Sequence, residues 1–325
     1  MQYRTLGRTG MKVSDVCLGT MTLGDQVAES DALPIIRTAL DHGVNFVDTA
    51  DRYGGGRSEE IVGKAIKGRR VDVIVATKVG GEVGPNPNDV GLSRSHIVRS
   101  VESSLRRLDT DYIDIYYAHR PDYTTPIEST LRAFDDLIRE GKVRHIACSN
   151  YLAYQLSKAL WVSDVQNLAR FDVVQPPYNL LTRDIEYELL PLCQEEGLGV
   201  CVYNPLAGGL LTGKHNPSEP PAAGTRFSND AMGQMYRARY WSESNFAAVA
   251  QVKAIADEAC KDMAQMALAW ILTNPAITSV IIGATSILHV TRNISAAAVT
   301  LSDEEREKCD AVWQHVSPVR FLYGR

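Results

Sequence analysis

The stretch VNFVDTADRYGGGRSEEIVGKAIKG (residues 44–68) decides the fold of this chain, because it joins an apolar strand to an amphipathic helix through a polar turn. Its first seven residues are mostly apolar, which is typical of a buried strand. From Ser58 onward apolar residues recur at helical spacing, and two glutamates follow the serine, as expected after an N-cap. We therefore expect a strand that ends near Asp48, a turn that carries Tyr53, and a helix capped by Ser58.

The same strand-then-helix unit recurs eight times along the chain. The strands are nearly continuous runs of Val, Ile and Cys, as expected of parallel strands covered on both faces. Eight units at a spacing of roughly 30 residues predict an α/β fold, a (β/α)8 TIM barrel that spans residues 1–325 as one domain. The predicted strands end at Thr20, Asp48, Lys78, His119, Asn150, Gln175, Tyr203 and Gly283.

A doubly wound sheet is the alternative fold, and it would hold a ligand on a glycine-rich turn after its first strand. No GxGxxG string follows that strand, and the GGGR string at 54–57 lacks the spacing of the motif. Residues 1–12, with Gly7 and Gly10, predict a β-hairpin that caps the barrel bottom. After the seventh strand, residues 204–243 form a long Pro- and Gly-rich insertion, which predicts either an irregular flap over the upper face or a disordered loop.

Composition excludes several classes of protein. The chain of 325 residues is 45% hydrophobic and 22% charged, which is ordinary for a globular protein, and its net charge of −5 gives no general basis for binding nucleic acid. Its apolar runs are far shorter than the ~18 residues of a membrane span. The start MQYRTLGRTGMKV does not resemble a signal peptide, and the six cysteines show neither CxxC spacing nor metal-like pairing with histidine. We expect a soluble, cytoplasmic protein that binds neither nucleic acid nor membranes.

Chemically useful side chains gather at the carboxyl ends of the strands, where barrels of this kind carry their catalytic groups. Asp48, Lys78 and His119 each end a strand, and Tyr53 follows the second strand by five residues. Each of these residues alone has an ordinary structural explanation, such as packing for the tyrosine or a surface position for the lysine. Their joint placement at one rim makes coincidence a poor explanation.

This set of side chains suits the reduction of a carbonyl group. Hydride addition to C=O leaves negative charge on oxygen, which needs a proton near neutral pH. A phenol has a reference pKa near ~10, and a neighbouring ammonium stabilises the phenolate and brings the phenol toward the range useful for acid catalysis. His119 can polarise the substrate oxygen. The chain has no GxSxG nucleophile motif, no Cys–His motif, and no HxH or HExxH string that would predict a metal.

At these residues the chain resembles the aldo-keto reductase superfamily. FVDTADRYGGGRSEEIVGKAI (46–66) is similar to the signature DTAxxYGxxxSExxxGxAL, and VRSVESSLRRLDTDYIDIYYAHRPD (98–122) is similar to a second signature with SLxRLxxDYIDLYxxH. The resemblance extends from about Tyr3 to the last helix. It is nearest to the branch that contains bacterial general aldo/keto reductases and potassium-channel β subunits.

The resemblance implies a catalytic tetrad of Asp48, Tyr53, Lys78 and His119, with Tyr53 as the proton donor. It also implies NADPH (NADP+ in the reverse direction), bound across the barrel mouth without a Rossmann domain. NPLAGGLLTGK (204–214) resembles the strip SPLAxGLLTGK, a backbone-rich loop suited to pyrophosphate. The implied cofactor contacts are Thr20, Met21, Asp48, Ser149, Asn150, Gln175, Tyr203, Asn204, Pro205, Leu206, Ala207, Gly208, Lys214, Arg226, Gly283, Thr285, His289, Arg292 and Asn293.

Two positions depart from the family pattern. The motif GASxxxQLxEN reads GATSILHVTRN (283–293), with His289 in place of Gln or Arg and Arg292 in place of Glu. Arg292 can meet a 2′-phosphate through charge-assisted hydrogen bonds, which favours NADPH, whereas the altered motif leaves use of NADH open. After the first strand, Met21 stands where a large aromatic residue is common, which predicts a roomier or more aliphatic substrate pocket.

We therefore predict an NADPH-dependent oxidoreductase that reversibly reduces aldehyde, ketone or sugar-like carbonyls, with hydride from nicotinamide C4 and a proton from Tyr53. Its expected partner is a small carbonyl compound, and the sequence predicts neither the physiological substrate nor the oligomeric state. Two alternatives stay open. One is a regulatory protein that keeps the cofactor but turns over little, as the resemblance to channel subunits allows. The other is a lyase that forms a Schiff base on Lys78.

Overall fold

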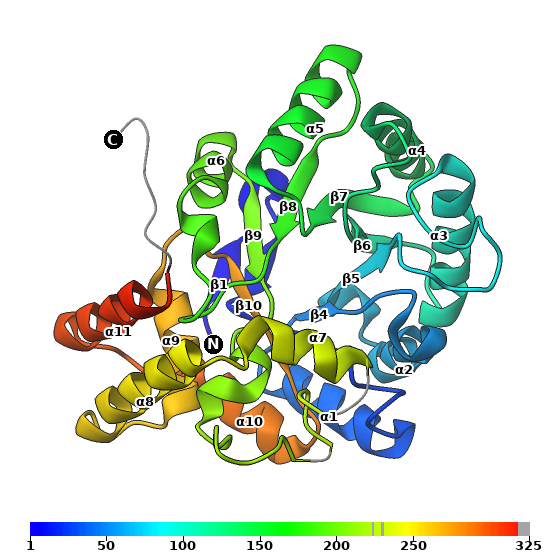
Figure 1. The fold of residues 1–325 in the computed structure, drawn as a ribbon. Helices are drawn as coiled ribbons and strands as arrows, with labels where there is room; N and C mark the ends of the chain where they lie inside the picture. Colours follow the sequence, from blue (N-terminus) through cyan, green and yellow to red (C-terminus); the bar gives the residue numbers. More distant parts are fainter. Residues whose placement is uncertain (223, 229–230, 318–325) are drawn as a thin grey trace. The chain divides into compact units, whose positions relative to one another are not determined.

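The computed structural model describes residues 1–222, 224–228 and 231–317 (Figure 1). The chain divides into two compact units. The first, called the barrel unit, comprises Met1–Pro176, Ile185–Tyr203 and Pro275–Ile294. The second, called the helical unit, comprises Pro177–Asp184, Asn204–Asn274 and the described residues of Ser295–Arg325. The assignment of the whole chain to one domain stays a prediction.

Eight parallel strands form a closed barrel in the barrel unit, as the sequence predicts. Each strand pairs with its neighbours in the chain, and the last pairs with both the first and the seventh, which closes the sheet (Figure 1). The strands are β3 (Val16–Gly19), β4 (Phe46–Asp48), β5 (Ile74–Val79), β6 (Ile113–Ala118), β7 (Val143–Ser149), β8 (Phe171–Gln175), β9 (Gly199–Val202) and β10 (Ser279–Gly283). The predicted strand ends agree with these bounds to within one residue.

Helices cover the outside of these strands. In α4, for example, Leu131, Phe134 and Leu137 recur at three-residue spacing and are fully buried, so this face packs on the barrel wall. The Phe134 ring contacts the Tyr116 ring of β6 edge-on, with centroids 5.7 Å apart. The helices of this unit are α1 (Glu29–Asp41), α2 (Arg57–Ile66), α3 (Arg94–Leu108), α4 (Ile127–Arg139), α5 (Ala153–Gln166), α6 (Leu189–Glu196) and α10 (Ile287–Ser295).

A hairpin of β1 (Tyr3–Thr5) and β2 (Lys12–Ser14) closes the barrel bottom, as predicted. Leu6 and Val13 are completely buried in the same apolar cluster as Cys17 of β3 and Ile115 of β6, so the hairpin plugs the barrel interior. The apolar run over residues 13–20, which ends at the predicted strand end Thr20, is not one continuous strand but is divided between β2 and β3. The run divides at Asp15, whose N–H donates to the Gln2 carbonyl of the hairpin and whose carbonyl accepts from Val280 of β10.

The barrel unit also contains three short 3₁₀ helices, η1 (Gly7–Thr9), η2 (Tyr53–Gly56) and η3 (Arg70–Asp72), and a fourth, η4 (Asp184–Glu186), runs from the helical unit into it. The η2 turn lies between β4 and α2, so it carries Tyr53 at the carboxyl end of the strands. This turn is therefore the part of the fold that places the predicted proton donor.

The helical unit contains most of the long insertion, and the prediction of an irregular or disordered segment over residues 204–243 is wrong for part of it. In α7, Tyr236 and Tyr240 stand one helical turn apart, are each 4% exposed, and stack with ring centroids 6.4 Å apart. This apolar contact stabilises a helix within a Gly- and Pro-rich sequence. The elements are η5 (Ala207–Thr212), α7 (Ala231–Tyr240), α8 (Glu243–Glu258), α9 (Met263–Thr273), η6 (Ala296–Ala298) and α11 (Asp303–Val316). Within the described chain, every helix is too short or too polar to cross a bilayer.

Candidate active site

Asp48 and Lys78 form a buried ion pair at the carboxyl ends of the neighbouring strands β4 and β5. The ammonium Nζ of Lys78 donates to Asp48 Oδ1 at 2.5 Å and to the Thr49 carbonyl oxygen at 2.7 Å. The other carboxylate oxygen, Asp48 Oδ2, accepts from Gln175 Nε2 at 2.8 Å. Lys78 is fully buried and Asp48 is 3% exposed. Both charges are therefore hydrogen-bonded, which a buried pair requires for stability.

The charge of Lys78 is maintained by its neighbours. Burial alone favours the neutral amine, but attraction to Asp48 and to the Tyr53 oxygen, together with hydrogen bonds to both, outweighs it. The pKa of Lys78 is therefore raised above its ordinary value of 10.5. The side chain is a permanent cation at neutral pH.

Tyr53 stands directly beside this cation, with Lys78 Nζ 5.1 Å from the centre of the phenol ring. The imidazole of His119 meets the same ring edge-on, with centroids 5.8 Å apart and planes at 80°. The structure thus brings together the four residues of the predicted tetrad. The phenol, the ammonium and the imidazole thus lie close together. Tyr53 is in the turn after β4, Lys78 is in β5, and His119 directly follows β6.

The Tyr53 turn has a fixed conformation. The Tyr53 N–H donates to the Ala50 carbonyl at 3.1 Å, and the three residues that follow are glycines with positive φ. A Cβ on Gly56, where φ is +96°, would lie 2.8 Å from Arg107 Cδ of α3. A Cβ there would have to displace the Arg107 side chain. Positive φ at Gly54, Gly55 and Gly56 is the feature that favours glycine at all three positions.

His119 is a neutral base in this environment. Its backbone N–H continues the β5–β6 pairing by donating to the Val79 carbonyl at 2.8 Å. Burial and the positive charges of Lys78, Arg52 and Arg120 lower the pKa of His119 well below 6.5. Its Nδ1 is buried and has no hydrogen-bond partner among the described residues. A neutral imidazole can donate one N–H to a substrate oxygen.

Four of the predicted cofactor residues form one hydrogen-bonded group on the same rim. Ser149 Oγ donates to the Gln175 carbonyl at 2.8 Å, and Asn150 Nδ2 donates to the His119 carbonyl at 2.9 Å. The Tyr203 hydroxyl donates to Asn150 Oδ1 at 2.7 Å. This group, together with the Gln175 contact to Asp48, connects β7, β8 and β9 to the tetrad.

The remaining predicted cofactor residues of the barrel unit follow two neighbouring strands, β3 and β10. Thr20 Oγ1 donates to the Asp48 carbonyl at 3.1 Å, and Met21 is partly buried after it. After β10, Asn293 Nδ2 donates to the Gly283 carbonyl at 3.1 Å. Thr285, His289 and Arg292 are exposed, and Thr285 Oγ1 shares a hydrogen bond of 2.9 Å with His289 Nδ1.

The predicted pyrophosphate residues belong to the helical unit, where Asn204 shapes the strip. Its Oδ1 accepts from the Gly208 N–H at 2.8 Å, and its Nδ2 donates to the Tyr240 hydroxyl at 2.7 Å. Arg226 donates to the Tyr236 hydroxyl at 2.7 Å. The strip is Asn204, Pro205, Leu206, Ala207 and Gly208, with Lys214 exposed beyond it. Their role in cofactor binding stays a prediction.

Two expectations about the start of α2 are corrected. Ser58 does not cap the helix, which begins at Arg57 without a side-chain cap. Its hydroxyl is instead buried and hydrogen-bonds Thr20 Oγ1 at 2.7 Å and Thr49 Oγ1 at 2.9 Å, so it joins three segments below the rim. Glu59, expected as a charge in the first helical turn, is fully buried.

Asp51 was missed by the sequence reasoning. It stands at a variable position of the DTAxxYG signature, within a run of polar turn residues that predicts exposure, yet it is only 3% exposed. No local sequence signal distinguishes it from a surface aspartate, because the groups that bury it come from α2, α3 and β6.

The chain is similar to known proteins over nearly its whole length. A family model described as "Aldo/keto reductase family" matches residues 15–314, which include every barrel strand and all four tetrad positions. The chain is 41% identical over 304 residues to a protein of Arabidopsis thaliana named "Probable voltage-gated potassium channel subunit beta", with 92% of each chain covered. A protein of the same name from Oryza sativa subsp. japonica is 41% identical over 323 residues, 97% of each chain. "Uncharacterized oxidoreductase YrpG" of Bacillus subtilis (strain 168) is 39% identical over 320 residues, 94% of this chain and 93% of that one.

Proposed function

The chain belongs to the aldo/keto reductase family, and from this premise we propose that it is an NADPH-dependent oxidoreductase that reduces aldehyde, ketone or sugar-like carbonyls to alcohols, reversibly. One observation carries the proposal. The buried cation Lys78, held by Asp48 at 2.5 Å, lies against the ring of Tyr53. This arrangement stabilises negative charge on a phenol oxygen and so favours proton donation by Tyr53.

The rim has the chemistry that NADPH requires. A nicotinamide carboxamide needs both donors and acceptors, and the side chains of Ser149, Asn150 and Gln175 supply hydroxyl and amide groups beside the tetrad. The exposed Arg292 on α10 offers a guanidinium to a 2′-phosphate. When bound, NADPH supplies the hydride for the carbonyl carbon.

Each residue of the proposed tetrad has its own role in proton transfer to the carbonyl oxygen. Tyr53 gives its proton to the carbonyl oxygen, and Lys78 stabilises the negative charge that stays on the phenol. Asp48 keeps Lys78 charged and oriented. Because His119 is neutral, it can donate an N–H to the carbonyl oxygen without adding a second cation beside Lys78.

The geometry weighs against a Schiff-base lyase. A lysine that attacks a carbonyl must be a neutral amine at working pH, which usually requires a lowered pKa. The pKa of Lys78 is raised, and its ammonium donates to Asp48 and Thr49. Failure of borohydride to trap a carbonyl compound on Lys78 is the expected result.

A binding role with slow turnover is the second candidate, favoured by the similarity to two proteins named as probable channel β subunits. One experiment distinguishes the two candidate functions: the consumption of NADPH and of NADH is measured with a series of aldehydes, ketones and sugars. We expect steady turnover with at least one carbonyl class and a preference for NADPH. Cofactor binding without multiple turnovers on any compound would overturn the reductase proposal in favour of the binding role.

A further inference from the structure

A second group of buried polar side chains lies behind the rim, on the outer face of the barrel wall. Residues alternate between the two faces of a strand, and Ala76 and Tyr117 belong to the barrel interior. Thr77 of β5 and Tyr116 of β6 therefore face outward, toward the helices. They meet Glu59 of α2, Arg107 of α3 and Asp51 of the segment before Tyr53. We call Asp51, Glu59, Thr77, Arg107 and Tyr116 the Asp51 cluster.

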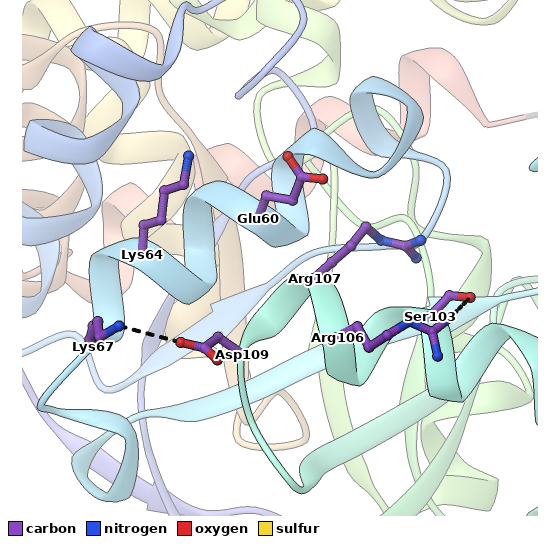
Figure 2. Close-up of a pocket in the computed structure, with 7 residues that line it drawn as sticks. All are labelled: Glu60, Lys64, Lys67, Ser103, Arg106, Arg107 and Asp109. Carbon is purple, nitrogen blue, oxygen red and sulfur yellow. Dashed lines mark hydrogen bonds and ion pairs between the residues drawn. The ribbon is translucent and has the colours of Figure 1, made fainter.

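Glu59 uses the only guanidinium of this cluster. Arg107 Nε donates to Glu59 Oε2 at 2.6 Å, and Thr77 Oγ1 donates to Glu59 Oε1 at 2.5 Å. Arg107 is 24% exposed, because its outer side reaches a hollow between α2 and α3 (Figure 2). The residues that line this hollow are Glu60, Lys64, Lys67, Ser103, Arg106, Arg107 and Asp109. Each Glu59 oxygen thus accepts a hydrogen bond, and Oε2 is also paired with the Arg107 guanidinium.

Asp51 is left without such partners. No side chain among the described residues hydrogen-bonds either carboxyl oxygen of Asp51 or the Tyr116 hydroxyl, although Asp51 is 3% exposed and Tyr116 is fully buried. A buried carboxylate that is compensated by neither a side-chain donor nor an ion pair is unstable, and the group becomes neutral instead. The cluster has two carboxyl groups, and its guanidinium is paired with Glu59. We therefore infer that Asp51 is the carboxyl group that keeps its proton.

The charged groups around Asp51 agree with this assignment. Burial, followed by repulsion from Glu59, raises the pKa of Asp51 to about 8. The attraction of Arg107 on α3, the polar contact with the Arg52 backbone and the attraction of the Arg52 side chain oppose this rise without cancelling it. The remaining neighbours are Tyr116 from β6, which is titratable, and Thr77 from β5, which is not.

The cluster is attached to both ends of the Tyr53 turn. At the start, the Asp51 N–H donates to the Lys78 carbonyl at 3.2 Å, two residues before Tyr53. At the end, the Arg107 side chain packs on Gly56, where an added Cβ would lie 2.8 Å from Arg107 Cδ. Displacement of Asp51 toward solvent would therefore move the backbone that carries Tyr53.

We propose that Asp51 is a positioning residue for Tyr53: as a neutral acid it holds the Tyr53 turn against the barrel wall, and its ionisation in alkaline solution displaces that turn and lowers turnover. Ionised Asp51 would place a second carboxylate beside Glu59, which already occupies the Arg107 guanidinium, and separation of the two groups requires movement of the turn. The proposal rests on the proposed function, because Asp51 acts on the reaction through Tyr53.

The test compares three proteins: the wild type, the variant Asp51→Asn and a matched control variant, Asp109→Asn. Asparagine has the shape of the protonated acid but does not titrate. Asp109 lies at the end of α3 beside the hollow with its side chain 76% exposed, and its positive φ of 51° suits asparagine. Two quantities are measured from pH 5 to 9: the melting temperature, and kcat with saturating NADPH and an aldehyde.

We expect the melting temperature of Asp51→Asn to rise relative to wild type as pH increases from 5 to about 8, because native Asp51 holds a proton that the unfolded chain has released. We expect kcat of Asp51→Asn to stay within about twofold of wild type at pH 6.5, while its alkaline decline moves up by about one pH unit or more. Asp109→Asn should change neither profile.

An unchanged alkaline decline in Asp51→Asn would show that Asp51 does not position Tyr53. A loss of about tenfold or more at pH 6.5 would show that the ionised carboxylate is needed, and would also overturn the proposal. If the variant does not fold, infrared titration of the wild-type protein decides instead: a carboxylic-acid band must persist above pH 6 and disappear near pH 8. Absence of any reductase activity would defeat the proposed function alone, since the melting and infrared data still report the protonation of Asp51.

Discussion

The ammonium of Lys78 lies 2.5 Å from Asp48 Oδ1, and both side chains are buried, with 0% and 5% of their surface exposed. Such a pair is interdependent, because each charge compensates the cost of burying the other. The position of the pair beside Tyr53 connects the stability of the barrel to its proposed chemistry. A change that removes one charge should therefore affect both.

Asp48→Asn should lower the free energy of unfolding by about 3–5 kcal/mol, because Lys78 remains buried without a counter-charge. The double variant with Lys78→Met should recover most of that loss. Since the pKa of Lys78 is raised in the fold, its contribution is complete below about 10.5 and is lost only as pH rises through the higher folded value. Denaturant unfolding at pH 7 measures these differences as a double-mutant cycle.

The matched control for this cycle is the exposed pair Lys64–Glu29, whose side chains are 54% and 46% exposed at a distance of 2.7 Å. Removal of either charge there should cost no more than about 1 kcal/mol. A loss at Asp48→Asn as small as at the exposed pair would contradict the interdependence of the buried pair.

Tyr53→Phe should lower kcat by roughly 10²–10⁴-fold, since it removes the proposed general acid but keeps the ring that packs on Lys78 and His119. The affinity for NADPH, measured by the quenching of protein fluorescence, should stay close to that of wild type. Tyr154→Phe on α5, a tyrosine that is 64% exposed, provides the control and should behave like wild type. Turnover by Tyr53→Phe near the wild-type rate would remove Tyr53 from the mechanism.

His119 should not titrate in the range in which an ordinary histidine does. Because its pKa is lowered well below 6.5, the unfolded chain takes up a proton below that pH while the native protein does not. Stability is therefore lost as pH falls below about 6.5, and His119→Asn should remove this part of the loss. Melting temperatures from pH 7.5 to 5 test the sign, with the exposed His42→Asn as control. A melting curve of His119→Asn that falls in parallel with wild type would contradict a neutral His119.

The sequence predicts the barrel well because strand runs that are apolar on both faces leave few alternatives to a parallel sheet. It predicts the tetrad because catalytic groups stand at strand ends, where Asp48 and Lys78 are visible as polar residues after apolar runs. The same local reasoning fails for Ser58 and Asp51, whose burial depends on partners far along the chain. Ser58 has the right type and position for an N-cap, but Thr20 and Thr49 bind its hydroxyl instead.

The insertion illustrates a second limit of local patterns. Gly and Pro density correctly predicts irregular backbone near η5, where Asn204 and Ala207 both have positive φ. The helix α7 follows from the stacking of Tyr236 on Tyr240, which a propensity argument underestimates because the energy comes from side-chain contact and burial.

Arg292→Leu should weaken the binding of NADPH by about 10–100-fold and leave the binding of NADH nearly unchanged. The reason is that only NADPH carries the 2′-phosphate, and a guanidinium recognises that group through charge-assisted hydrogen bonds. Arg292 is exposed on α10, so its replacement should not disturb the fold. Arg306→Leu on α11, where the side chain is 46% exposed, serves as the control for a lost surface charge.

Titration calorimetry with both dinucleotides at fixed salt separates the possible outcomes for Arg292. Equal weakening of NADPH and NADH would place Arg292 at a part of the dinucleotide that the two share, such as the pyrophosphate. No weakening of either would remove Arg292 from the cofactor site and leave the selectivity to His289 and Thr285, which precede it in the chain and share a hydrogen bond of 2.9 Å. Because the family pattern has Glu where this chain has Arg292, a selective loss of NADPH affinity would show that this chain recognises the 2′-phosphate with a residue of its own.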